Sequence, residues 1–148
     1  MRAVIQRVKK AEVIVKPNYS SQIDQGLLIF LGIENEDNQT DIDWLVRKIS
    51  NMRIFSDPEG KMNLSLLDTG FQAMVVSQFT LYASTKKGNR PSFVRSAKPG
   101  IAKPLYKKFI EDLAQELNQE VGTGIFGADM KVELINDGPV TIIIDSKN

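Results

Sequence analysis

Alternating and continuous runs of hydrophobic residues predict several strands along the chain. In the first segment, Ala3 and Ile5 lie on one face of an extended chain and Val4 and Val8 on the other. Two later segments are continuous apolar runs, which are typical of buried strands. The predicted strands are residues 2–8, 13–15, 26–33, 73–81, 130–134 and 140–144.

Apolar residues spaced by three and four positions predict two helices. The first covers residues 41–52, with Thr40 or Asp41 as its cap, and the second begins near Pro104 and ends before Gly122. Turns are predicted at residues 17–21, 57–60 and 136–139. With no repeat and no linker, this order of elements predicts one α/β or α+β domain.

The composition is that of a globular protein. Of the 148 residues, 42% are hydrophobic and 25% are charged. No apolar run reaches the roughly 18 residues that span a bilayer, and the N-terminus lacks the apolar core of a secretory signal. The absence of cysteine excludes disulfides and fits a reducing compartment, so we expect a cytoplasmic protein without membrane association.

Charge is distributed unevenly, although the net charge is only +1. No Asp or Glu occurs between Thr69 and Ile110, and the remainder of the chain has a net charge of −7. A basic segment of this kind favours an anionic partner, phosphate groups above all, although a basic surface without a ligand would have the same composition. The eight bases in the segment are Lys86, Lys87, Arg90, Arg95, Lys98, Lys103, Lys107 and Lys108.

The chain contains no histidine and no cysteine. The commonest general base and the most reactive nucleophile at neutral pH are therefore both excluded, together with the usual ligands of zinc. An enzyme of this composition must use hydroxyls, carboxylates, lysines, backbone amides or groups of its substrate. A binding domain would need none of these. We expect no metal and no organic cofactor.

Ser77, Gln78 and Thr80 interrupt a hydrophobic strand with hydrogen-bonding side chains. Buried polar groups cost free energy unless they are paired, so the segment from Ser77 through Phe79 to Thr80 is a candidate pocket wall. The alternative is the polar end of a strand that leaves the core. A nucleophilic hydroxyl is disfavoured here, because no histidine is present to act as its base.

Three further segments are candidates for binding, and each also has a structural explanation. The first combines bases with an aromatic residue, as in contacts to RNA, and contains Lys86, Lys87, Arg90 and Phe93. In the second, Phe126 and Met130 belong either to the core or to a base pocket. The third is the turn that contains Gly138-Pro139, a peptide bond that sequence statistics predict to be trans.

Taken together, these segments resemble the D-aminoacyl-tRNA deacylases, also called D-tyrosyl-tRNA deacylases. The resemblance extends over nearly the whole chain and is most specific in two short motifs about 60 residues apart. These are Ser77-Gln78-Phe79-Thr80 and Gly138-Pro139-Val140-Thr141. Other matching segments are residues 1–8, 60–63, 88–93 and 126–130.

The resemblance implies that residues 1–148 are one deacylase domain of mixed α+β class, with a β-barrel-like sheet core and two main helices. It implies hydrolysis of the ester of D-aminoacyl-tRNA, and of glycyl-tRNA, as chiral proofreading in translation. It also implies a homodimer with active sites at the interface. Gly138-Pro139 would then be cis, would be held by Arg7, and would exclude L-amino acids from the partner's site.

The resemblance also assigns roles within the pocket. Ser77, Gln78, Phe79 and Thr80 would lie beside the scissile carbonyl, and their N–H groups would stabilise the oxyanion. Phe126 and Met130 would contact the terminal adenosine, and Lys86, Lys87 and Arg90 are candidates for tRNA contact. Two alternatives remain from the residues alone: a non-catalytic RNA-binding module, and a serine or threonine hydrolase of small esters.

Overall fold

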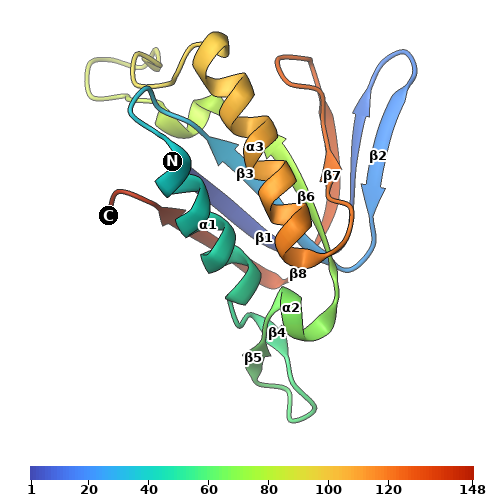
Figure 1. Ribbon diagram of the computed structural model, residues 1–148. Coiled ribbons are helices and arrows are strands. Elements are labelled where there is room, and N and C mark those ends of the chain that lie inside the picture. The colour runs from blue at the N-terminus through green and yellow to red at the C-terminus, as the bar shows by residue number, and fades with distance from the viewer.

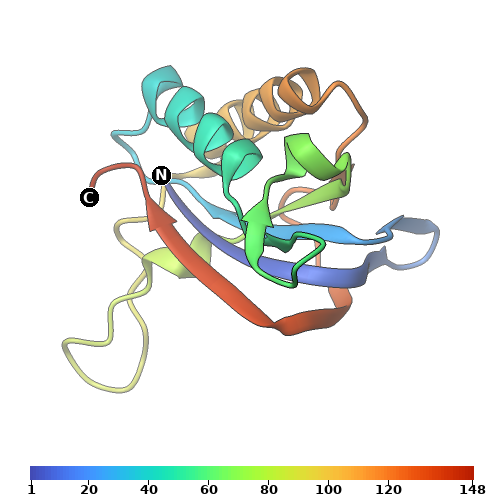
Figure 2. The ribbon, with the colours of Figure 1, turned by 90° about the horizontal axis from the view of Figure 1, so that it is seen from below.

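The computed structural model describes residues 1–148 and places two main helices on one face of a strongly bent sheet (Figures 1 and 2). The strands are β1 (Arg2–Val15), β2 (Tyr19–Ile23), β3 (Gly26–Gly32), β4 (Phe55–Ser56), β5 (Met62–Leu64), β6 (Gln72–Ser77), β7 (Gly122–Thr123) and β8 (Lys131–Asp145). The helices are α1 (Gln39–Asn51), the single turn α2 (Leu66–Thr69), the 3₁₀ turn η1 (Phe79–Tyr82) and α3 (Pro99–Leu117).

The long strand β1 organises the sheet. It pairs antiparallel with β3 along its first half, with β2 along its second half, and with β8 along its other edge. The sheet continues from β3 to β6 and β7 through parallel pairings, in the order β2-β1-β3-β6-β7. Because β1 and β8 are both long and bent, the sheet is nearly closed, which confirms the expected mixed class and barrel-like core.

Hydrophobic side chains form a core on each face of the sheet. The larger core lies between the sheet and helices α1 and α3, and includes Ile5, Ile29 and Phe109, all fully buried. The smaller core lies on the opposite face, where Leu28 and Met74 pack with Val13. No helix of the structure combines the length and apolar character that a bilayer crossing requires.

Several predicted boundaries were wrong for local reasons. Helix α1 is capped by Asn38, not by Thr40 or Asp41, because the Asn38 side chain accepts from Thr40 N and Asp41 completes a capping box. Helix α3 begins at Pro99, and Pro104 lies inside its second turn, where it cannot donate a backbone hydrogen bond to the preceding turn. Its end is at Leu117, followed by Asn118 in the left-handed conformation.

The predicted turns near both ends of the chain were also wrong in part. Tyr19 to Ser21 belong to β2, so the first turn is confined to residues 16–18. Residues 136–139 lie inside the continuous strand β8 and not in a hairpin. Pairing with β1 breaks register there, which makes the segment a bulge. The Lys16-Pro17 and Gly138-Pro139 peptide bonds are both cis, against the statistical expectation for Gly138-Pro139.

Candidate active site

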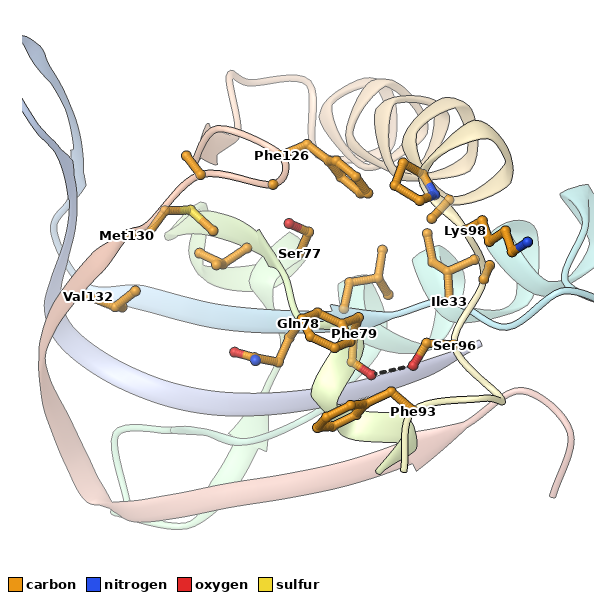
Figure 3. Close-up of a pocket in the computed structure, with 17 residues that line it drawn as sticks. Ile33, Ser77, Gln78, Phe79, Phe93, Ser96, Lys98, Phe126, Met130 and Val132 are labelled. Atoms are coloured by element: carbon orange, nitrogen blue, oxygen red, sulfur yellow. Dashed lines mark hydrogen bonds between the residues drawn. The ribbon is translucent and has the colours of Figure 1, made fainter. Parts of the chain in front are cut away.

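A cavity of about 620 Å³ lies where β6 ends (Figure 3). Strand β6 stops at Ser77 and not at Leu81 as predicted, because Phe79–Tyr82 turn into η1. The Gln78 N–H donates to the Leu31 carbonyl at 2.8 Å, which holds this change of direction against β3. The polar interruption in the sequence is therefore a strand end that also forms the pocket wall.

The cavity is predominantly apolar. Its lining residues are Leu31, Ile33, Val76, Ser77, Gln78, Phe79, Phe93, Ser96, Ala97, Lys98, Pro99, Ala102, Phe126, Gly127, Ala128, Met130 and Val132. Lys98 is the single residue with an ionisable side chain in this set. An apolar cavity with a few polar groups is the usual form of a small-molecule site, and this size accommodates a nucleoside.

Phe126 and Met130, whose role the sequence left open, both line the cavity. Phe126 packs against Tyr106 with a centroid separation of 5.7 Å, and Tyr106 OH donates to the Val75 carbonyl at 2.8 Å. Burial raises the pKa of Tyr106 to about 12, so this hydroxyl remains a neutral donor. The aromatic wall is thereby fixed between α3 and β6.

The turn η1 is held by side chains from two other segments, β1 and the residues before α3. Ser96 Oγ donates to the Phe79 carbonyl at 2.7 Å, and Arg2 donates to the Leu81 carbonyl at 3.0 Å. The Tyr82 ring is buried, and the guanidinium groups of Arg2 and Arg95 lie 4.9 and 5.2 Å from its centroid. The N–H groups of Phe79 and Thr80 begin η1, so no carbonyl within that turn accepts from them.

Tyr82 does not provide the missing base. Burial raises the pKa of its hydroxyl far above the usual range, and the negative charges of Asp37 and Glu34 raise it further. The phenol is therefore neutral at physiological pH. The acidic side chains of the protein also form no cluster that could hold a metal ion. The polar groups that line the cavity are backbone groups, the hydroxyls of Ser77 and Ser96, the Gln78 amide and the Lys98 ammonium.

Not every predicted site residue lines the cavity. Thr80 is exposed beside it, with its hydroxyl bonded to the Gln78 side-chain amide. Gly138 and Pro139 are exposed in the β8 bulge and do not line this chain's own cavity. Arg7 lies beneath that bulge and donates to the carbonyls of Asp137, at 2.8 Å, and Ile54, at 2.6 Å.

The basic residues Lys86, Lys87 and Arg90 occupy an exposed loop that projects from the body of the protein (Figure 2, yellow-green). The loop is closed at its base by a bridge in which Ser84 and Ser92 exchange backbone hydrogen bonds of 2.8 and 2.9 Å. Sequence reasoning did not select Ser96, Lys98 or Ala102 as site residues. Only the fold brings them to the cavity, from the start of α3 and the segment before it.

Comparison with known proteins identifies the family of this chain. Residues 4–145 match the family model described as D-Tyr-tRNA(Tyr) deacylase. The chain belongs to this family. Family membership confirms the resemblance found in the sequence and the expectation that the protein is an enzyme.

Individual relatives of this deacylase family match over their full length. The D-aminoacyl-tRNA deacylase of Christiangramia forsetii is 63% identical over 99% of this chain and 98% of the relative. That of Bacteroides thetaiotaomicron is 58% identical over 100% and 99%. Among solved structures, a c-Myc DNA unwinding element binding protein has a TM-score of 0.90 at 41% identity, covering 98% of both chains. A probable eukaryotic D-amino acid tRNA deacylase, at 15% identity and a TM-score of 0.85 over 97% of both chains, shares the fold.

Proposed function

We propose that this protein hydrolyses the ester bond of D-aminoacyl-tRNA and releases the free D-amino acid and tRNA. The observation that carries this proposal is an apolar cavity of nucleoside size bounded by the Ser77–Phe79 segment, in a chain whose full-length relatives are D-aminoacyl-tRNA deacylases. The chemistry suits a site without histidine, because an aminoacyl ester is already activated toward attack by water.

In the proposed complex, the terminal adenosine lies against Phe126 and Met130, and the ester carbonyl lies beside Ser77, Gln78 and Phe79. Water attacks the carbonyl carbon, and the oxyanion that forms accepts hydrogen bonds from backbone N–H groups at the start of η1. The carbon–oxygen bond to the ribose then breaks, and the ribose oxygen leaves as a hydroxyl with a proton from the attacking water. The neighbouring 2′-hydroxyl of the RNA assists the water.

We infer that Gly138 and Pro139 select the D-configuration, with their carbonyls facing the α-carbon of the substrate. Three contacts support a fixed conformation of this bulge. Arg7 donates to the Asp137 carbonyl, and the Asn136 side chain bonds both the N–H and the carbonyl of Val140. A rigid backbone can exclude the side chain of an L-amino acid without contacting the side chain of a D-amino acid. Glycyl-tRNA, which has no side chain to exclude, is a second proposed substrate.

We further propose a homodimer in which the bulge of one subunit completes the cavity of the other. Gly138 and Pro139 are exposed and do not line their own chain's cavity. A substrate bound in the cavity would therefore contact Gly138 and Pro139 of the other subunit. An apolar strip on the face of the sheet opposite the helices supports such an interface. It contains Val4, with Phe30 and Ile143 as its direct cross-strand neighbours, and the Ile143 side chain is 67% exposed.

The deciding experiment is deacylation of matched D-tyrosyl-tRNA and L-tyrosyl-tRNA by the purified protein. We expect release of D-tyrosine with the L-ester spared. Equal hydrolysis of both esters, or of neither, contradicts the proposal. Thr80→Ala separates the mechanism from a threonine-nucleophile hydrolase. Partial loss of activity is expected when the backbone stabilises the oxyanion, and complete loss when Thr80 attacks.

A non-catalytic RNA-binding role is the second candidate, and the projecting loop with Lys86, Lys87 and Arg90 is the observation that favours it. It predicts salt-dependent binding of uncharged tRNA without turnover. In the enzyme, the same loop would bind the tRNA backbone. Replacing all three bases with alanine should then lower kcat/KM for D-tyrosyl-tRNA and leave kcat/KM for a D-tyrosyl ester of adenosine unchanged.

A further inference from the structure

Lys98 is the one ionisable side chain in an otherwise uncharged cavity. Figure 3 shows it at the side of the cavity away from Met130 and Val132, with its amino group directed outward from the rim. It forms no salt bridge, whereas Arg95 is paired with Glu34 at 2.9 Å and Lys108 with Asp112 at 2.5 Å. An unpaired cation at the mouth of an apolar site is available to an anionic part of the ligand.

The backbone on both sides of Lys98 is firmly positioned. The N–H of the preceding residue, Ala97, donates to the Ile33 carbonyl at 2.9 Å, and Ala97 is only 9% exposed. Lys98 itself is the N-cap of α3, which begins at Pro99. The positive end of a 19-residue helix therefore starts at the Lys98 backbone and adds to the local positive potential.

We propose that Lys98 binds the phosphate on the 5′-oxygen of the terminal nucleoside, the group that links it to the rest of the tRNA. This inference rests on the proposed function, which places the adenosine and the ester in the cavity. A ribose carries its base, its 3′-ester and its 5′-phosphate on three different sides. With the base against Phe126 and the ester beside Gln78, the phosphate is directed to the remaining side of the cavity, where Lys98 lies.

The contact has a clear physical effect. The phosphate is the only charged group on the part of the RNA that enters the cavity, and an ammonium ion attracts it as a point charge. Lys98 is therefore a positioning residue that orients the nucleoside, so that the ester meets η1. It would also distinguish RNA-linked esters from free aminoacyl esters, which carry no phosphate.

The test uses a pair of small substrates that differ only in the phosphate: 3′-D-tyrosyl adenosine and 3′-D-tyrosyl adenosine 5′-monophosphate. Lys98→Ala should lower kcat/KM for the phosphorylated ester by roughly five- to tenfold, mainly through KM, and leave the other ester unchanged. Lys98→Arg should retain most of the activity. Lys103→Ala removes an exposed base of the same helix that does not line the cavity, and should change neither substrate.

The phosphate contact is refuted if Lys98→Ala lowers kcat/KM equally for both esters. It is also refuted if Lys98→Ala lowers kcat/KM no more than Lys103→Ala does. A binding measurement distinguishes a wrong phosphate contact from a wrong proposed function. If the wild-type protein hydrolyses neither ester, the proposed function fails, and titration with adenosine and adenosine 5′-monophosphate then decides the contact. Tighter binding of the monophosphate by the wild-type protein, lost in Lys98→Ala, supports it, and equal binding of the two ligands refutes it.

Discussion

Arg7 connects three segments that are distant in sequence, and its replacement by methionine tests how the β8 bulge is held. The side chain starts on β1, is 11% exposed, and donates to the carbonyl of Ile54 before β4 and to that of Asp137 in β8. Methionine retains much of the apolar stem but none of the donors. Arg7→Met therefore leaves two half-buried carbonyls without their partner.

The size of the effect follows from these contacts. A hydrogen bond that involves a charged group contributes about 1.5–3 kcal/mol, and partial access of water to both carbonyls lowers the sum. We expect Arg7→Met to reduce the free energy of unfolding by about 2–4 kcal/mol, a large share of the roughly 5–15 kcal/mol typical of a domain. For a chain of 148 residues, this corresponds to a decrease in Tm of roughly 6–12 °C.

Urea denaturation at a fixed protein concentration measures the change, with Arg53→Met as the matched control. Arg53 also bonds a carbonyl, that of Asn63, but the contact is exposed, so its loss should cost less than about 1 kcal/mol. The same Arg7→Met protein should hydrolyse D- and L-tyrosyl-tRNA with a reduced preference for the D-ester. Equal stability of the two variants would refute the argument that Arg7 holds the bulge.

Four further outcomes are expected. Gly26→Ala should prevent folding or cost more than about 3 kcal/mol by urea denaturation, because its Cβ would lie 1.8 Å from a β6 carbonyl oxygen, whereas Gly100→Ala, which meets nothing within 4 Å, should be neutral. Tyr106→Phe should cost about 1 kcal/mol in the same assay, through one lost buried hydrogen bond. The pKa values of Asp41 and Asp145 are lowered because hydrogen bonds and nearby cations outweigh burial. The two carboxylates therefore stabilise the folded protein fully above about pH 4, and this contribution is lost on further acidification. Acid titration followed by circular dichroism should show the loss. The pH profile of kcat/KM should show no inflection near the pKa of histidine, about 6.5, since the chain contains none.

Local sequence patterns were sufficient to predict the type of an element where its apolar residues follow one clear spacing. The apolar run from Gly26 is a central strand, and the spacing of Ile42, Leu45 and Ile49 is that of a helix packed on a sheet. Boundaries were less accurate, because caps depend on side-chain hydrogen bonds such as that of Asn38. The prediction of a turn at residues 136–139 was wrong, because pairing with β1 extends on both sides of the bulge and keeps the segment within one strand.

The sequence by itself determined the chemical limits of this protein. Without histidine or cysteine, catalysis is limited to hydroxyls, carboxylates, lysines, backbone groups and the substrate, and the motifs at Ser77 and Gly138 indicated the family. Only the tertiary structure decided which residues share a cavity. Ser96, Lys98 and Ala102 come together with Phe126 because the segment before α3 pairs with the residues that follow β3 and α3 packs over β6. Such contacts are set by packing between elements far apart in the chain, and no local pattern of hydrophobic and polar residues encodes them.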